Sequence, residues 1–321
     1  RGEGAAGRIG HQMTCIVIDG AKGKEYVPAT LEDESLATEA RAEVDSFPDF
    51  GELPAAPDEP LPPQGTLGFR VQRYGVKKWK DLFNPRQLLA LLHFTKAVRE
   101  VYPEIVEATR VDEYSRCVAT CLALLIDRVA EYTSSVCRWD NSQERVVGTF
   151  SRGALPMVWD YPEVNPFSHA VGALAPLLEA NQRVLARGAG SISADGQVES
   201  MLGSAGSLCH GDAEVDAVIT DPPYYDAVPY ADLSDFFYVW LKRTIGHLYP
   251  DVFSTPLTPK KEEIVQHAGR HDTKEAAKRF YVSEMTKAFQ EAHRVLKDDG
   301  IFVVVFAHKT TDAWETLIQS L

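Results

Sequence analysis

Several features that would mark other protein classes are missing from this sequence of 321 residues. No apolar run approaches the roughly 18 residues that a membrane-spanning helix needs, and the N-terminal residues lack the apolar core of a signal peptide. The cysteines form no CxxC pair. We therefore expect a cytoplasmic protein with reduced thiols, no membrane association and no metal site in this chain.

An excess of basic charge is also missing. The net charge is −13, and residues 1–66 alone hold 13 acidic and 5 basic residues. Nucleic-acid-binding domains are usually basic somewhere. Short basic clusters occur at Lys77–Lys80, Leu241–Arg243, Pro259–Lys261 and His267–Arg279, but such clusters are more typical of solvated surfaces. The charge therefore neither supports nor excludes DNA as a partner.

What is present divides the chain into four segments. Residues 1–45 are expected to form a small β element, with a strand around "MTCIVI", a turn at "DGAKGK" and a partner strand at "EYVPA", followed by an acidic, helix-compatible stretch over 31–45. Residues 46–75 are expected to form a proline-rich linker, because Ser46–Thr66 contains six prolines. Residues 76–160 are expected to be helical. Residues 161–321 are expected to form an α/β catalytic region.

Within the helical segment, Asn84 is a predicted N-cap and Pro85 a predicted first helical residue. Apolar positions recur behind them at helical spacing. A further helix is predicted over Phe167–Arg187. Two near-continuous apolar strands, "VDAVIT" and "IFVVVFA", are separated by helices in the last third of the chain. This alternation indicates a parallel sheet covered on both faces, whose ligands bind at the carboxyl ends of the strands.

The tetrapeptide Asp221–Tyr224, "DPPY", stands at one of these strand ends. Asp221 accepts hydrogen bonds, and Pro222 and Pro223 lack backbone donors and fix the directions of their carbonyls. Tyr224 adds a flat aromatic face. Such a clamp suits a planar ligand with an exocyclic amino group, which donates to Asp221 and to the Pro222 carbonyl while its ring stacks on Tyr224.

These residues carry a resemblance. "DPPY" after a buried strand is similar to the motif of the amino-group DNA methyltransferases that use S-adenosylmethionine. The longer strings "TDPPYYDAVPYADLSDFFYVWLKR", "LFNPRQLLAL", "LPMVWDYPEVNPF", "LTPKKEE" and "GIFVVVFAHK" resemble the large prokaryotic adenine-specific DNA methylases that carry a zinc ribbon. The likeness runs from "GRIGHQMTCIVIDG" to the last residue. We take the chain as the C-terminal, DPPY-containing part of such a protein.

The resemblance implies a Rossmann-like parallel sheet, incomplete in this chain, with a helical insertion and a small N-terminal β element. It implies DNA as the partner, S-adenosylmethionine as the cofactor and N6 of a flipped adenine as the target. Asp221 and Pro222 would hold the amino group, Pro223 would shape the turn and Tyr224 would stack on the base. Tyr225 and Asp226 would line the base pocket, or Asp226 would only cap a turn. Methylation of N4 of cytosine, methylation of an RNA base and a non-catalytic DNA-binding subunit remain alternatives.

A glycine-rich cofactor loop is the expected motif that we do not find. "GEGAAG" at Gly2–Gly7 has no strand before it and no clear helix after it. We therefore expect further segments or subunits to supply that loop. Within this chain, the predicted cofactor contacts are Asn84 and Arg86, unless they are only a helix cap and a surface arginine. Ser204 and Asp212 are also predicted, unless "GSAGSLCHGD" is a plain loop.

Overall fold

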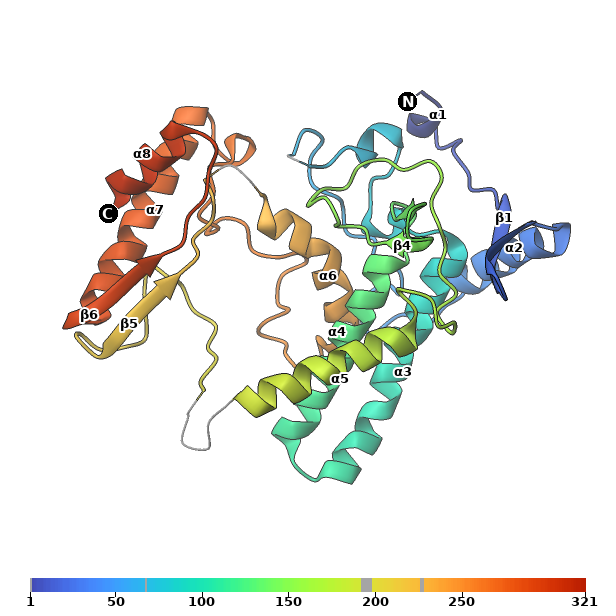
Figure 1. Cartoon of the computed structure of the whole chain (residues 1–321), viewed down its shortest axis with the longest axis horizontal. Coiled ribbons are helices and arrows are strands. Elements are labelled where there is room, and N and C mark those ends of the chain that lie inside the picture. Colours follow the sequence, from blue (N-terminus) through green and yellow to red (C-terminus); the bar gives the residue numbers. More distant parts are fainter. Residues whose placement is uncertain (1, 67, 192–197, 226–227) are drawn as a thin grey trace. The chain divides into compact units, whose positions relative to one another are not determined.

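The computed structural model describes residues 2–66, 68–191, 198–225 and 228–321, and they form an α/β structure of helices and small sheets (Figure 1). The chain divides into two compact units: unit 1 is Arg1–Ile192 with Asp232–Thr258, and unit 2 is Ser193–Ala231 with Pro259–Leu321. The described helices are α1 (Gly2–Ala5), α2 (Leu31–Asp45), α3 (Pro85–Thr109), α4 (Asp112–Tyr132), α5 (Leu174–Ser191), α6 (Tyr230–Ile245), α7 (Lys274–Val295) and α8 (Thr311–Ser320), with short 3₁₀ turns at Val71–Tyr74, Trp79–Leu82 and Ala268–Arg270. The described strands are β1 (Cys15–Gly20), β2 (Gly23–Pro28), β3 (Arg138–Asp140), β4 (Arg145–Val147), β5 (Val215–Thr220) and β6 (Leu296–Val304).

After α1, unit 1 contains the hairpin that its sequence predicts, and the helix-compatible stretch 31–45 forms α2. β1 and β2 pair antiparallel across the turn that joins Gly20 to Gly23. α2 follows with Thr30 as its N-cap, whose hydroxyl accepts from the backbone N–H of Asp33 while the Asp33 carboxylate accepts from the backbone N–H of Thr30. This reciprocal pair satisfies two backbone donors that a helix start would otherwise leave open.

The core of unit 1 lies where α3, α4 and α6 contribute their apolar faces. α3 starts as predicted, with Asn84 as N-cap and Pro85 in the first turn. Its buried side chains recur at the predicted helical spacing. They are Gln87, Leu88, Leu91, Leu92, Thr95 and Val98. Trp79, Phe236 and Trp240 complete the aromatic centre of this core.

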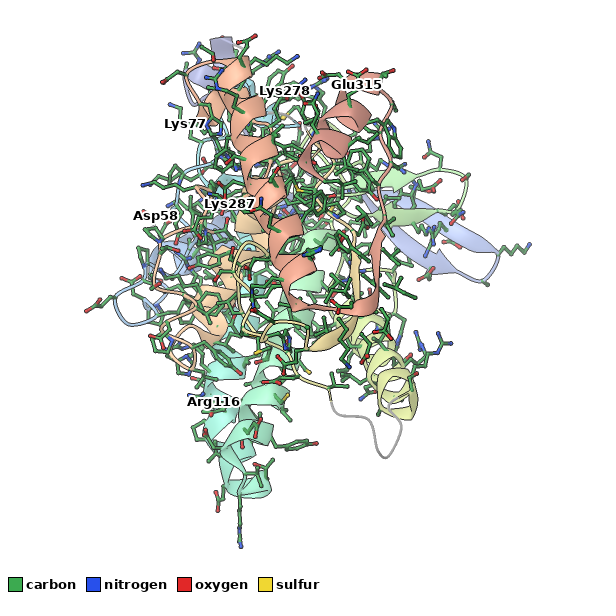
Figure 2. The ribbon with its side chains drawn as sticks, turned by 90° about the vertical axis from the view of Figure 1, so that its left-hand side faces the viewer. Asp58, Lys77, Arg116, Lys278, Lys287 and Glu315 are labelled. Atoms are coloured by element: carbon green, nitrogen blue, oxygen red, sulfur yellow. The ribbon has the colours of Figure 1, made fainter. Side chains whose placement is uncertain are left out.

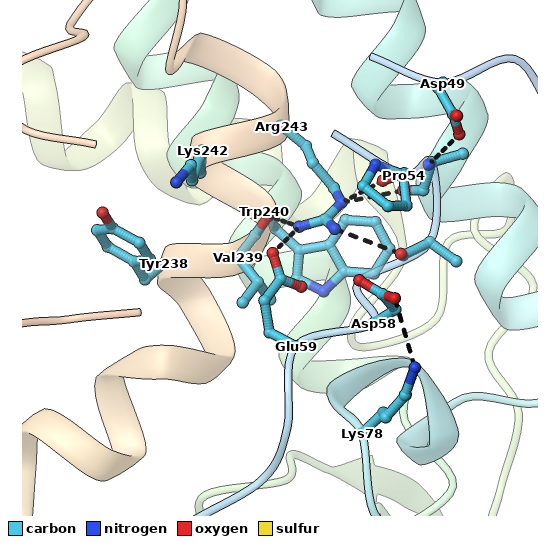
Figure 3. A network of polar contacts seen from close by, with 12 residues as sticks. Asp49, Pro54, Asp58, Glu59, Lys78, Tyr238, Val239, Trp240, Lys242 and Arg243 are labelled. Carbon is cyan, nitrogen blue, oxygen red and sulfur yellow. Dashed lines mark hydrogen bonds and ion pairs between the residues drawn. The ribbon is translucent and has the colours of Figure 1, made fainter. Parts of the chain in front are cut away.

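The proline-rich segment packs onto this core through Phe50, Ala55 and Leu61. Figure 3 shows the polar contacts that hold it. The fully buried Arg243 side chain of α6 donates to the carbonyls of Pro54, Ala55 and Ala56 and pairs with Glu59 at 3.0 Å. Arg243 is therefore a core residue. Its place in the basic cluster Leu241–Arg243 had indicated a solvated surface, and for Arg243 this expectation is wrong.

One buried acid of unit 1 has a carboxylate oxygen without a hydrogen-bond partner in the described chain. Asp127 of α4 is 4% exposed, and its Oδ1 has no hydrogen-bond partner in the described chain. Burial raises the pKa of this carboxyl well above its usual range. The folded protein therefore retains a proton that the unfolded chain releases once the pH exceeds about 3.8. The contribution of Asp127 to stability falls as the pH rises from that value through the raised pKa.

We expect Asp127→Asn to be better tolerated at neutral than at acidic pH. The difference between variant and parent in the free energy of unfolding should shift by about 1–3 kcal/mol in favour of the variant between roughly pH 4 and pH 7. Urea denaturation at both pH values measures it. Asp112→Asn on the same helix is the control, because the Asp112 side chain is 75% exposed. Equal shifts in both variants would contradict the assignment.

Unit 2 holds the parallel pair that positions the DPPY motif. β5 and β6 run parallel, in register from Ala217 opposite Ile301 to Thr220 opposite Val304. Before Ala217 the pairing is irregular, and "DDG" at Asp298–Gly300, which the sequence predicts as a turn, lies within the bounds of β6. Figure 1 shows α7 and α8 beside these strands.

The expected burial of both sheet faces is wrong for the described chain. One face of the pair packs against α7 and α8 through Phe302 and Val304, which contact a core that contains Met285. On the other face Ile219 is 73% and Ile301 63% exposed. The reason is that no described segment of unit 2 forms a second layer on that face. The apolar sequences of the two strands led to the expectation, because parallel strands are normally covered on both faces.

Two further observations complete the fold. α5 begins at Leu174, seven residues after the predicted start at Phe167, because the chain over Asn165–Ala173 forms turns in which the Asn165 side chain accepts from the backbone N–H of Phe167. Among the described residues, no helix is both long and apolar enough to cross a membrane.

Figure 2 shows Lys278 and Lys287 projecting from α7. Lys278 pairs with Asp312, and Lys287 pairs with Glu284.

Candidate functional site

The candidate site is the turn that follows β5. The strand carries the chain to the carboxyl end of the parallel pair, where the Thr220 carbonyl accepts from the backbone N–H of Val305 at 2.8 Å. The sheet hydrogen bonds stop there, and Asp221 is exposed immediately beyond them. The carboxylate therefore stands at the sheet edge where ligands of α/β proteins bind.

The two proline carbonyls of this turn differ in availability. The Pro223 carbonyl accepts from the Tyr281 hydroxyl at 2.8 Å and from the backbone N–H of Tyr225 at 2.9 Å. Burial raises the pKa of Tyr281 to about 12, so its hydroxyl remains a donor at neutral pH. No group in the described chain donates to the carbonyl of Pro222. Pro223 is thus fixed from within the fold, and Pro222 and Asp221 present the acceptors that remain available.

Tyr224 lies beside these acceptors. A side-chain hydrogen bond with Asp221 raises the pKa of the Tyr224 hydroxyl. The ring meets Phe306, which follows β6, edge to face at a centroid distance of 5.4 Å. A carboxylate has about four lone-pair sites, so one hydrogen bond from Tyr224 leaves Asp221 able to accept others. The aromatic face and the acceptor pair therefore come from one short turn.

Tyr225 anchors the turn. Its φ of 57° lies in the left-handed region, which non-glycine residues adopt rarely, often at functional sites. The side chain is 3% exposed, contacts Tyr281 edge to face and donates to Asp312 Oδ2 at 3.0 Å. Its ring thus lies in the core of unit 2, where it fixes the backbone after Tyr224. Asp226, the other predicted pocket residue, lies outside the described residues.

Asn84 and Arg86 lie in unit 1, and protein groups occupy their polar atoms. Asn84 Nδ2 donates to Glu163 at 2.6 Å and to the Tyr161 hydroxyl at 3.1 Å. The Arg86 guanidinium makes two hydrogen bonds to the Glu163 carboxylate, at 2.9 and 2.8 Å. Tyr161 also contacts His11 Nδ1 at 2.9 Å. The helix-cap alternative for Asn84 is confirmed, and the predicted cofactor contact of both residues gains no support from this geometry.

Ser204 and Asp212 lie in unit 2, and both precede β5 in the chain, whereas the DPPY turn follows it. The Ser204 hydroxyl accepts from the backbone N–H of Gly206, as in a plain turn. Asp212 precedes β5 and pairs with Arg294 at 2.8 Å, whereas Asp221 follows the strand. Six residues of strand span about 20 Å. The strand therefore separates Asp212 from Asp221.

The residues that the sequence reasoning missed are supports from distant parts of the chain. Tyr281, Asp312 and Phe306 hold Pro223, Tyr225 and Tyr224, respectively. The only sequence signal for Tyr281 was its place on the apolar face of the helix now seen as α7. In the described parts of the chain, no group of three or more His, Cys, Asp or Glu side chains could hold a metal ion.

Comparisons of this chain with protein-family models, with curated proteins and with solved structures returned no match. The candidate site is therefore defined by its own residues. It is an exposed carboxylate and an available carbonyl at the end of a parallel strand, beside a tyrosine ring.

Proposed function

We propose that the protein is an S-adenosylmethionine-dependent DNA methyltransferase that acts on the exocyclic amino group of a flipped base, with N6 of adenine as its target. The observation that carries the proposal is the acceptor pair of the turn. The Asp221 carboxylate and the Pro222 carbonyl are available, while the neighbouring Pro223 carbonyl is occupied by Tyr281 and Tyr225. An amino group has two N–H donors, which this pair can accept.

The proposed role of this chain is to hold and polarise the base. Asp221 and Pro222 accept from the amino group and increase electron density on its nitrogen, and the ring of Tyr224 offers a stacking surface worth about 1–3 kcal/mol. Positioning and electrostatics of this kind lower the barrier without a covalent intermediate. S-adenosylmethionine supplies the methyl group in this class of reaction.

The predicted cofactor contacts gain no support from the contacts within their own units. Asn84 and Arg86 bind Glu163 in unit 1, Ser204 accepts from a neighbouring backbone N–H, and Asp212 pairs with Arg294. We propose that β5 and β6 are two strands of a larger Rossmann-like sheet and that other segments or a partner subunit hold the cofactor. The exposed Ile219 and Ile301 support this reading, because parallel strands are normally covered on both faces.

Two kinds of alternative remain distinguishable: methylation of another base, and DNA binding without catalysis. The acceptor pair binds an amino group and not a particular base, so N4 of cytosine and RNA bases fit it as well. The occupied groups of Asn84 and Arg86 favour, instead, a DNA-binding subunit without catalysis. All three readings place the protein with nucleic acid in the cytoplasm.

The test is methyl transfer by the whole protein. It is incubated with unmethylated DNA, or with RNA, and S-adenosylmethionine labelled in its methyl group. The nucleic acid is then digested and its nucleosides are identified. We expect labelled N6-methyl-2′-deoxyadenosine from DNA. Labelled N4-methylcytosine or label in RNA would move the proposal to the corresponding alternative, and DNA binding without any transfer would favour the non-catalytic subunit.

A further inference from the structure

A cavity in unit 1 has no part in the site described above. It lies beside the β3–β4 hairpin and has a volume of about 230 Å³. This is many times the roughly 10–15 Å³ that one water molecule requires. Arg138, Ser151 and Arg152 contribute to its polar lining, and Val136 and Met157 to its apolar lining. The space is large enough for a polyatomic anion together with part of the group that carries it.

Three polar side chains of the lining, Arg138, Ser151 and Arg152, carry donors that no acceptor of the described chain satisfies fully. Arg138 Nε is buried and has no hydrogen-bond partner in the described chain. Neither Arg138 nor Arg152 forms an ion pair with any carboxylate of the described residues, and the same residues offer the Ser151 hydroxyl no hydrogen bond. The Thr149 hydroxyl, also in the lining, is by contrast already used, since it donates to the Glu131 carbonyl at 2.6 Å.

Two acids near the cavity, Asp140 and Glu131, are engaged by other groups. The Asp140 carboxylate accepts from the backbone N–H and the hydroxyl of Ser142, at 2.9 and 2.7 Å. These hydrogen bonds are the main reason for its lowered pKa, and Arg138 is the smallest contribution. The Glu131 carboxylate pairs with Arg128. The two guanidinium groups of the cavity therefore form no ion pair in the described chain, and an anion would complete them.

The cavity wall is preorganised. The backbone N–H of Thr149 donates to the Glu131 carbonyl of α4 at 2.9 Å, and the backbone N–H of Leu155 donates to the Gly68 carbonyl at 3.0 Å. In return, the backbone N–H of Arg70 donates to the Leu155 carbonyl at 3.2 Å. The loop that bears Ser151 and Arg152 is thus held at both ends, so binding there does not need to order it first.

We propose that this cavity binds a phosphate group of the nucleic-acid backbone. Two guanidinium groups and a hydroxyl match the several oxygens of a phosphate, and the apolar lining suits the sugar next to it. The inference rests on the proposed function for the identity of the nucleic acid. Its role is to position the strand, and it contributes nothing to the choice of base.

Arg152→Gln in the whole protein tests this assignment, because Arg152 is exposed and its replacement should not impair folding. The affinity for a fluorescently labelled DNA duplex is measured by anisotropy at several salt concentrations. We expect a loss of about 5–10-fold near 0.1 M salt and a shallower slope of log affinity against log salt, by about 0.9. Arg138→Gln should act in the same direction, and thermal melting checks its fold.

Arg183→Gln is the matched control. It removes the same charge from α5, where the Arg183 side chain is 65% exposed and, among the described residues, lies within ion-pair distance only of Glu179. If Arg152→Gln weakens DNA binding no more than Arg183→Gln does, the proposal is overturned. Titration with inorganic phosphate and with deoxyadenosine monophosphate separates the sources of the phosphate. Suppose that Arg152→Gln abolishes the binding of these small phosphates but leaves the slope of log DNA affinity against log salt unchanged. That result would also overturn the assignment of the cavity to the DNA backbone.

Methyl transfer by the same variant separates this proposal from the function on which it rests. If the protein methylates DNA, Arg152→Gln should raise the KM for DNA and leave kcat within about twofold, because a positioning contact acts on binding. If Arg152→Gln methylates DNA with the parental KM for DNA, the phosphate site is rejected and the proposed function is retained. If the protein binds DNA with an affinity that Arg152→Gln lowers, but methylates no nucleic acid, the proposed function is rejected and the phosphate site is retained.

Discussion

Asp221→Asn is expected to lower the kcat of methyl transfer by about 10²–10³-fold, the loss typical of removing one preorganised electrostatic contact from an active site. Asparagine has nearly the same size but carries no charge, so it cannot polarise the amino group of the base. Its own amide N–H donors would also face the donors of that group. Asp221 is exposed, and its replacement should leave the melting temperature almost unchanged.

Asp216→Asn is the matched control, because it makes the same change within β5, the strand that leads into Asp221. The Asp216 side chain is 86% exposed and pairs with Lys297 at 2.7 Å, at a distance from the turn. We expect this variant to retain parental activity. Steady-state kinetics with labelled S-adenosylmethionine compares the two. An Asp221→Asn protein with kcat within about threefold of the parent would remove this residue from the proposed mechanism.

Local features of this protein were predictable from its sequence because neighbouring residues determine them. The β1–β2 hairpin follows from turn residues between two short strands, and the start of α3 follows from Asn84 and Pro85. The strand that leads into Asp221 was likewise apparent from the apolar run before it. In the hairpin and the helix start, the stabilising contacts join residues close in sequence, whereas β5 shows only its apolar pattern locally and pairs with the distant β6.

The supports of the candidate site were not predictable, because they come from far along the chain. The Tyr281 hydroxyl reaches the Pro223 carbonyl across 58 positions, and Glu163 reaches Arg86 across 77. Asp232 and Asp235 of α6 are buried, although their charge made solvent exposure plausible, and Asp235 accepts from Thr258. A pattern of residue types does not reveal which distant group satisfies a polar atom.

Exposure of the parallel strands shows a different limit. The apolar residues of β5 and β6 correctly indicate strands that a full sheet would bury. Whether a second layer is present depends on segments that the pattern of these strands does not describe. Ile219 and Ile301 therefore read as core residues in the sequence and are exposed in the described chain.

Arg243→Met is expected to destabilise unit 1 by about 3–5 kcal/mol, the cost of leaving one partner of a buried ion pair uncompensated. The change removes the donors for the carbonyls of Pro54, Ala55 and Ala56 and strips Glu59 of its only ion-pair partner in the described chain. Methionine fills the volume without donating. The free energy of unfolding is measured in urea by tryptophan fluorescence, since Trp79 and Trp240 are buried in this core.

Lys242→Met is the control for the loss of a positive charge from α6. Lys242, one residue earlier, donates to the Thr255 carbonyl in an exposed contact, so its replacement should cost less than about 1 kcal/mol. Figure 3 shows both side chains on the same helix. Similar losses in the two variants would mean that the Arg243 contacts contribute little beyond surface charge.

The double variant Arg243→Met with Glu59→Met distinguishes the unpaired charge from the lost carbonyl contacts. Removing both partners eliminates the stranded carboxylate, so the double variant should recover part of the stability that Arg243→Met loses. The remainder then measures the contribution of the guanidinium to fixing the proline-rich segment through its carbonyls. A double variant no more stable than Arg243→Met alone would place the whole effect in those carbonyl contacts and not in the ion pair.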